Sequence, residues 1–353
     1  MDKNLPIVEQ NKKLILKKSK SLMSVTDKIL AKKELQQNDE KWIEKLWEWA
    51  DENGVADSSW VEYNGGYWKG FPRNREKLLN LRGLYLGENR LASIPREIGN
   101  LVGLTELVLP YNRLSTLPKE IYNIGELREL IVAYNQLEEI DPEISNLTNL
   151  IKLQLHNNRL STIPDDIGKL SKLKQLSLSE NMIAHLPARV GELSSLNRLL
   201  LNSNHLTTIP SEMTNLKSLK GLWLDNNQIE KLPEDMSGFV ELSILSLNNN
   251  NLLEIPDTIS KLNHLTELNL SGNRLGILPD EISRLSSLST LTVAKNRLVR
   301  LPMDIVNLTN LTKLSLDANP NLILTKRQKE WIRELKANKR LKISIDSDLL
   351  DRA

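Results

Sequence analysis

Residues 104–126 read L-T-E-L-V-L-P-Y-N-R-L-S-T-L-P-K-E-I-Y-N-I-G-E, and a 23-residue unit of this form recurs along most of the 353-residue chain. Ten full copies run from residue 81 to residue 310, and an eleventh copy begins at Leu311 and stops after Asn319. A repeat of this length predicts a solenoid in which each copy forms one coil. One asparagine occupies the same place in every copy: Asn89, Asn112, Asn135, Asn158, Asn181, Asn204, Asn227, Asn250, Asn273, Asn296 and Asn319.

The pattern within one copy predicts its local structure. The L-x-L segment alternates with the period of a β-strand, so its leucines are expected to face inward. Because successive coils turn in the same direction, their strands must stack as a parallel sheet. The asparagine follows the strand, where its amide can bond backbone groups that the turn leaves unpaired, and a ladder of asparagines is therefore expected. The proline and the short return path predict extended or 3₁₀ segments on the convex side.

The repeat resembles that of the leucine-rich-repeat superfamily over about two-thirds of the chain. Its L-P-x-x-I variant is most similar to the intracellular Ras-group-related repeat proteins of plants and animals and to their bacterial counterparts. The resemblance implies a horseshoe that binds other proteins. One copy carries the motif in these residues: Leu104, Leu107, Leu109, Asn112, Leu114, Leu117, Pro118, Ile121 and Ile124.

The repeats and their flanks together predict an α/β solenoid, a leucine-rich-repeat horseshoe. We expect a concave parallel sheet of about eleven strands, a 3₁₀ or extended convex side and a helical cap at each end. Residues 1–36 are expected to form a basic amphipathic helical arm, and residues 37–80 a tryptophan-rich helical N-terminal cap. Residues 81–319 hold the repeats, and residues 320–353 hold a C-terminal cap helix and a short strand.

The N-terminal flank has the composition of a cap, which a solenoid needs to cover its open end. Asn38 or Asp39 is expected to N-cap a helix that runs to about Asn53 and ends at Gly54. The stretch from Tyr63 to Trp68 then predicts a turn into the first coil. An alternative function for exposed aromatic residues here is stacking on sugars. Five tryptophans precede the repeats, namely Trp42, Trp47, Trp49, Trp60 and Trp68, and the predicted apolar helix face is Trp42, Ile43, Leu46, Trp47 and Ala50.

The C-terminal flank predicts a second cap. Thr325 and Gln328 form a T-x-x-Q capping box before a helix over residues 326–338. That helix would carry Trp331, Ile332 and Leu335 on one face, and the alternation of Leu341, Ile343 and Ile345 predicts one last strand.

Residues 1–36 have an amphipathic pattern, because Val8, Ile15, Leu22 and Ile29 are spaced seven apart and the polar side is rich in lysine. Three interpretations remain open. The segment packs on the cap or on a second copy of the chain, it forms a loosely ordered arm, or it docks on an anionic membrane or an acidic partner.

The composition limits the class of protein. The formal net charge of +2 is too close to balance to indicate nucleic acid as a partner of the whole chain. The chain has no cysteine and no apolar run long enough for a membrane span or a signal peptide. A cytoplasmic protein is therefore expected, with export without a cleaved signal as the alternative.

The sequence holds no recognisable catalytic motif. Its four histidines (His156, His185, His205 and His264) occupy different places in different repeats, and no phosphate-binding or nucleophile motif occurs. We expect no enzymatic activity, no catalytic residue, no cofactor and no metal site.

The residues between the strand leucines are expected to face the concave surface, where a partner would bind. Two apolar patches stand out there, the first flanked by two glutamates, whereas the C-terminal half is small and polar and is expected to bind weakly or not at all. The alternative is that β-favouring residues merely fill strand positions. The candidate contact residues are Tyr85, Glu106, Val108, Tyr111, Glu129, Ile131 and Tyr134 in the first patch, and Leu200 and Trp223 in the second.

The favoured function is a protein-binding scaffold or adaptor that uses the concave face, in signalling or as an effector. Its partner is expected to be a protein, with no nucleic acid and no transmembrane segment. The alternative is a surface-associated recognition protein. In that case the lysine-rich N-terminal helix binds an anionic membrane, or the exposed aromatic residues bind a glycan.

Overall fold

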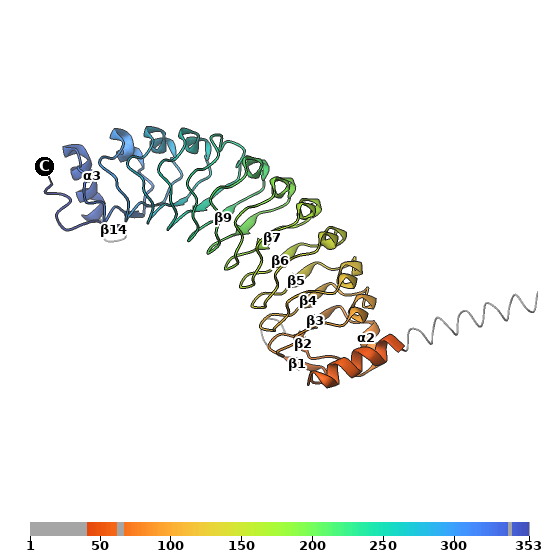
Figure 1. Cartoon of the computed structure of the whole chain (residues 1–353). Coiled ribbons are helices and arrows are strands. Elements are labelled where there is room, and N and C mark those ends of the chain that lie inside the picture. The colour runs from red at the N-terminus through yellow and green to blue at the C-terminus, as the bar shows by residue number, and fades with distance from the viewer. Residues whose placement is uncertain (1–40, 62–66, 338–340, 353) are drawn as a thin grey trace, which may run out of the picture.

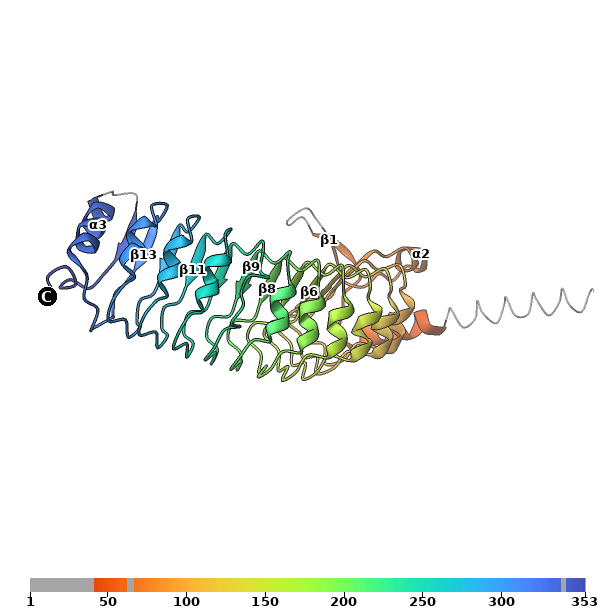
Figure 2. The same cartoon turned by 90° about the horizontal axis from the view of Figure 1, so that it is seen from above.

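The computed structural model describes residues 41–61, 67–337 and 341–352. The coils stack side by side in one curved row, with the strands on the inner side and the 3₁₀ helices on the outer side (Figure 1). The two caps lie at opposite ends of this row. Seen from above, the 3₁₀ helices follow one another along the outer face (Figure 2). The expected solenoid is confirmed.

One sheet of 14 strands runs the length of the molecule in sequence order. The eleven repeats contribute eleven parallel strands of three residues each, as predicted, with the central residue of each strand buried. Their register opposes residues that are 23 apart, so that Leu107 lies beside Leu130. These strands are β3 (Gly83–Tyr85), β4 (Glu106–Val108), β5 (Glu129–Ile131), β6 (Lys152–Gln154), β7 (Gln175–Ser177), β8 (Arg198–Leu200), β9 (Gly221–Trp223), β10 (Ile244–Ser246), β11 (Glu267–Asn269), β12 (Thr290–Thr292) and β13 (Lys313–Ser315).

The convex side of the described chain carries nine 3₁₀ helices, eight of which begin directly after the repeat proline. In the one coil where Asp141 replaces that proline, the Asp141 carboxylate accepts the Glu143 N–H at 2.9 Å and caps the helix in its place. The nine helices are η1 (Arg96–Asn100), η2 (Lys119–Asn123), η3 (Pro142–Asn146), η4 (Asp165–Lys169), η5 (Ala188–Glu192), η6 (Ser211–Asn215), η7 (Asp257–Lys261), η8 (Asp280–Arg284) and η9 (Met303–Asn307).

The asparagine ladder forms as expected. Asn158 is representative: its Oδ1 accepts the Leu137 N–H at 2.9 Å, and its Nδ2 donates to the Val132 carbonyl at 2.9 Å and the Leu155 carbonyl at 3.0 Å. The ladder asparagines from Asn112 to Asn319 are buried. Asn89 is half-buried at the start of the ladder, and its Nδ2 donates to the carbonyl of Gly87 in its own turn.

The residue before each ladder asparagine is left-handed in all eleven copies. Its φ lies between 53° and 72°, although only one of the eleven residues is a glycine. The side chain at this position therefore projects just after the strand, from a residue whose backbone conformation most non-glycine residues avoid. The eleven residues are Glu88, Tyr111, Tyr134, Asn157, Glu180, Ser203, Asn226, Asn249, Gly272, Lys295 and Ala318.

The N-terminal cap contains the predicted helix, which covers residues 41–52 in the described chain. Gly54, at φ +65°, ends it, and the Val55 N–H donates to the Ala50 carbonyl at 2.8 Å. The helix buries Trp49, which the predicted face left out, and Trp49 meets Phe71 edge-on at 6.1 Å. Of the predicted face, Ile43, Leu46 and Ala50 are buried, whereas Trp42 and Trp47 are partly buried.

Three short elements complete this cap, and the sequence did not predict them as strands or helix. Strands β1 (Ser59–Val61) and β2 (Tyr67–Lys69) pair antiparallel, and β2 continues the sheet beside β3. Helix α2 (Arg75–Leu79) follows, with Asn74 as its N-cap. The predicted N-cap at Asn38 or Asp39 and the centre of the predicted turn lie outside the described residues.

The C-terminal cap matches its prediction closely. Helix α3 (Lys326–Ala337) begins with the capping box, because the Thr325 N–H donates to Gln328 Oε1 at 3.1 Å and the Gln328 N–H donates to Thr325 Oγ1 at 3.3 Å. Trp331 and Ile332 are buried against the last coil, with Leu335 partly buried beside them. Strand β14 (Lys342–Ser344) adds the expected final parallel strand beside β13.

The proposed arm, residues 1–36, lies outside the described residues, so its three interpretations stay open. Within the described ranges, no helix has both the length and the apolar character needed to cross a membrane.

Candidate functional site

Strands β3 to β5 place the first predicted patch on the concave face. Tyr85, Val108 and Ile131 occupy paired positions in the three neighbouring strands, and each is partly exposed. The strand leucines between the outward-facing positions are buried. The structure thus brings these residues together as expected, and they form the floor of the patch.

Tyr111 and Tyr134 form its most exposed part. Their rings stack with centroids 4.3 Å apart and an angle of 12° between their planes, yet the two residues remain 53% and 39% exposed. Both are left-handed, with φ of 56° and 55°. The alternative that β-favouring residues merely fill strand positions therefore does not apply to this pair, because their positions are not in β conformation. A tyrosine with positive φ costs on the order of 1 kcal/mol, and the fold imposes this conformation on the residue before every ladder asparagine.

His156 extends the tyrosine pair by one coil. Its ring meets that of Tyr134 edge-on at 5.3 Å, and its Nδ1 lies 3.3 Å from the Ser177 hydroxyl. Burial lowers the pKa of His156 from its usual value, although the nearby Glu180 carboxylate acts in the opposite direction. The four histidines occupy different places in different repeats, so the sequence did not predict a role for His156. Its place two residues before the ladder asparagine, one coil after Tyr134, was the available signal.

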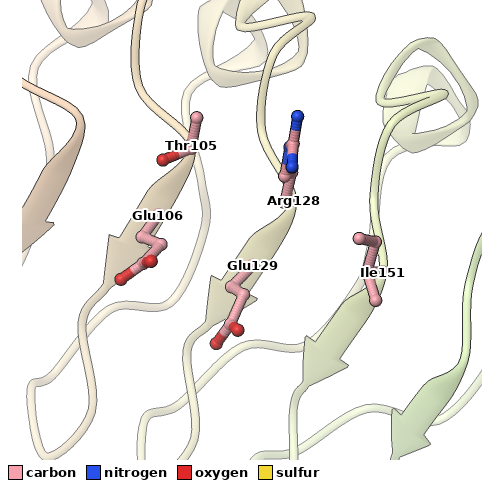
Figure 3. Close-up of a pocket in the computed structure, with 5 residues that line it drawn as sticks. All are labelled: Thr105, Glu106, Arg128, Glu129 and Ile151. Atoms are coloured by element: carbon pink, nitrogen blue, oxygen red, sulfur yellow. The ribbon is translucent and has the colours of Figure 1, made fainter.

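Two carboxylates lie beside the patch, as predicted. Glu106 and Glu129 occupy paired positions in β4 and β5. Like charges in such positions repel each other. Each carboxylate is stabilised by a polar or charged group of its own. The Tyr85 hydroxyl donates to Glu106, and Lys152 Nζ lies 3.2 Å from Glu129. The two glutamates line a small hollow of about 210 Å³, in which their side chains extend in the same direction while that of Arg128 extends away from them (Figure 3).

The second patch, Leu200 and Trp223, is also brought together, because these two residues pair between β8 and β9. The Trp223 ring lies beside Gly221, where an added Cβ would come within 2.2 Å of it. The Arg198 guanidinium covers the ring at 5.1 Å from its centroid. The repeat pattern does not predict this three-residue arrangement. The available signal was a glycine two residues before an aromatic residue, which occurs at Gly221 and Trp223 and also at Gly83 and Tyr85.

A hollow of about 490 Å³ borders both patches. His156 and Leu200 line it from either side, with Glu180 and Arg198 among the charged groups. The tyrosine pair, the hollow and Trp223 therefore form one continuous concave surface over strands β4 to β9, which we call the aromatic surface.

The concave face beyond β9 differs, because its polar side chains bond one another. Asp225 Oδ1 accepts the Ser246 hydroxyl at 2.7 Å and the Asn248 N–H at 2.7 Å, and Asn202 Oδ1 accepts the Asp225 N–H at 2.9 Å. Asn248 Oδ1 in turn accepts the Ser271 N–H at 3.0 Å. The sequence pattern did not predict this second, shorter ladder. It occupies groups that would otherwise be available to a partner.

Comparisons with known proteins agree with this architecture. Family models described as "Leucine-rich repeat region" and "Leucine rich repeat" match residues 141–231 and 241–298. A leucine-rich-repeat protein of Leptospira interrogans is 35% identical, with a TM-score of 0.63 and coverage of 76% of this chain and 72% of that chain. A search of curated proteins found no match.

Two further solved structures are similar. The plant peptide hormone receptor RGFR1, in complex with RGF2, is 32% identical with a TM-score of 0.58, and the match covers 72% of this chain and 46% of that chain. An internalin (InlF) of Listeria monocytogenes is 24% identical with a TM-score of 0.60, and the match covers 76% of this chain and 81% of that chain.

This chain belongs to the leucine-rich-repeat superfamily. The fold of this superfamily is, in general, that of a protein-interaction scaffold. The described residues contain no cluster of three or more histidine, cysteine, aspartate or glutamate side chains that could hold a metal ion.

Proposed function

We propose that this protein is a scaffold that binds a protein partner through the aromatic surface of strands β4 to β9. The observation that carries the proposal is the stacked pair Tyr111 and Tyr134, which stays exposed at left-handed positions. Exposed aromatic residues of this kind are frequent hot spots of protein interfaces, and apolar surface patches mark interaction sites.

The surroundings of the pair support the proposal. His156 and Trp223 extend the aromatic character over several coils, and the 490 Å³ hollow between them offers a depression for a partner side chain. Charged groups lie at the margin of this surface, as in the rim of a protein interface. The similar plant receptor RGFR1 forms a complex with RGF2, which supports a polypeptide as partner here.

Affinity capture from a cell lysate tests the proposal. We would compare the intact protein with a Tyr111→Ala, Tyr134→Ala, Trp223→Ala variant. A matched control, Val240→Ala, Leu253→Ala, Met303→Ala, removes three exposed apolar side chains that follow strand β9 in the chain and lie outside the aromatic surface. We expect the control to capture the same proteins as the intact chain and the aromatic variant to lose them, provided that all three proteins unfold at similar temperatures. Equal capture by the aromatic variant would contradict the proposal.

The membrane alternative depends on residues 1–36, and sedimentation with anionic liposomes tests it separately. Deleting these residues should leave sedimentation unchanged if the scaffold proposal is complete. Loss of liposome binding on deletion would support the membrane alternative.

A further inference from the structure

A row of basic side chains follows the edge of the sheet at which strands β5 to β9 begin. Each of these five successive coils places one cation there, alternately on the residue before the strand and on its first residue. The neighbouring coils on either side hold Thr105 and Glu106, or Ser243 and Ile244, in the same two places. We call this set the cationic row: Arg128, Lys152, Lys174, Arg198 and Lys220.

Backbone hydrogen bonds fix the spacing of the row. The Ile151 N–H donates to the Arg128 carbonyl at 2.7 Å, and the Lys174 N–H donates to the Ile151 carbonyl at 2.8 Å. The same pattern continues through Asn197 to Lys220, with distances of 2.9 Å. Adjacent coils are therefore about 4.8 Å apart, and with the one-residue alternation along the strand, successive cations start roughly 6 Å apart.

Most of the positive charge in the row has no internal partner. Arg128, Lys174, Arg198 and Lys220 are exposed, and within the described ranges no carboxylate forms an ion pair with any of the four. Lys152 alone is paired, with Glu129 at 3.2 Å. Like charges on neighbouring strands repel each other, and a bound anion would offset this electrostatic repulsion between the cations.

The row also borders the aromatic surface. Arg198 both covers the Trp223 ring and lines the 490 Å³ hollow opposite His156. A partner that contacts the aromatic residues would therefore pass within reach of the row. The following inference rests on the function proposed above and specifies the chemistry of the partner.

We propose that the cationic row binds an acidic, extended segment of the partner polypeptide, which lies along the solenoid axis across β5 to β9. Along the solenoid axis the row advances about 4.8 Å per coil, so its five cations span roughly 19 Å, a length that about six residues of an extended chain cover. About three acidic residues at alternate positions can therefore lie over the five cations, whose long side chains bridge the difference in spacing. Electrostatic complementarity of this kind selects among partners and speeds their association.

A polypeptide fits this surface better than a continuous polyanion. Glu106, Glu129 and Glu180 lie on the same concave face, close to the row. A polymer with a negative charge on every unit would be repelled by these carboxylates. A peptide can place neutral or basic residues opposite them, so the mixed charge of the face favours a polypeptide.

Fluorescence anisotropy at about 50 mM salt, where surface charges are weakly screened, tests the inference. The probe is a labelled peptide of about ten residues that alternates glutamate and serine, and its neutral control has glutamine in place of glutamate. The row variant is Arg128→Glu, Lys174→Glu, Lys220→Glu, and none of these three residues forms an ion pair in the described part of the chain. The matched control makes the same change of charge at Lys261, Arg284 and Lys326, which are exposed on η7, η8 and α3.

We expect the intact protein and the control variant to bind the glutamate peptide alike, and the row variant to bind it about tenfold more weakly or worse, since each lost ion pair weakens binding modestly. The glutamine peptide should bind none of the three proteins. No binding by the intact protein, or equal weakening in both variants, would refute the inference. So would tighter, row-dependent binding of an oligothymidylate of the same length or of anionic vesicles, because the partner would then be a nucleic acid or a membrane.

The two proposals can fail separately. The Tyr111→Ala, Tyr134→Ala, Trp223→Ala variant tests the aromatic surface by lysate capture, whereas the row variant is tested with a synthetic peptide. If the row variant binds the glutamate peptide normally while the aromatic variant loses its captured proteins, the scaffold function stands and the acidic segment does not.

Discussion

Replacing one ladder asparagine should show how much of the stability depends on satisfying the buried turns. In Asn158→Ala, the Leu137 N–H and the carbonyls of Val132 and Leu155 lose the three hydrogen bonds, of 2.9 to 3.0 Å, that the side chain provides. A buried backbone group left unsatisfied costs about 1–3 kcal/mol. Only the Leu137 N–H is left without a partner, because the Val132 carbonyl still accepts from Asn135 Nδ2 and the Leu155 carbonyl from Asn181 Nδ2. One unsatisfied N–H and two weakened carbonyls predict a loss of about 2–4 kcal/mol in the free energy of unfolding.

Equilibrium unfolding in urea, followed by circular dichroism, measures this loss. The matched control is Asn89→Ala, because Asn89 is half-buried and its amide donates to the carbonyl of Gly87 within its own turn. We expect the control to cost about 1 kcal/mol. A loss below about 1 kcal/mol for Asn158→Ala, or equal losses for the two variants, would show that the ladder does not hold the turns together as reasoned.

Three further predictions concern the concave face. Gly221→Ala should displace the Trp223 ring, because the added Cβ would meet it at 2.2 Å, and a red shift of tryptophan fluorescence with little change in the melting temperature would show this. Tyr111→Asn should change the free energy of unfolding by less than about 1 kcal/mol while weakening partner capture, because the relief of positive φ and the loss of stacking on Tyr134 oppose each other; a larger loss of stability in urea would contradict this. Burial lowers the pKa of His156 in the folded state, so its contribution to stability is present above the unfolded pKa, near 6.5, and is lost as pH falls through the folded pKa. Unfolding in urea below that pH should therefore be less pH-dependent in His156→Gln than in the intact protein, and identical pH profiles would refute the assignment.

The repeats made most of the fold predictable. Each coil packs against a nearly identical neighbour, so one pattern of leucine, asparagine and proline determines the strand, the ladder and the 3₁₀ turn of all coils. The caps were predicted less completely because their contacts occur once. The edge-on packing of Trp49 on Phe71, the hairpin of β1 and β2, and α2 have no repeat to reveal them.

The candidate site was predictable in position but not in detail. Register alone placed Tyr85, Val108 and Ile131 side by side. The stacking of Tyr111 on Tyr134 and the covering of Trp223 by Arg198 depend on rotamers that side chains choose between coils, which periodicity does not specify. Whether these residues bind a partner stays a prediction, as do cytoplasmic localisation and the similarity to the Ras-group-related repeat type.

The left-handed residue before each ladder asparagine has a consequence for how such a surface can change over evolution. The hydrogen bonds of the ladder hold the backbone of this position, and its side chain neither fills the core nor joins the sheet. Accordingly, glutamate, tyrosine, serine, lysine, alanine and glycine all occur there within this one chain. A lineage can therefore exchange these eleven residues, one per coil, and acquire a new binding preference while the scaffold that presents them keeps its stability.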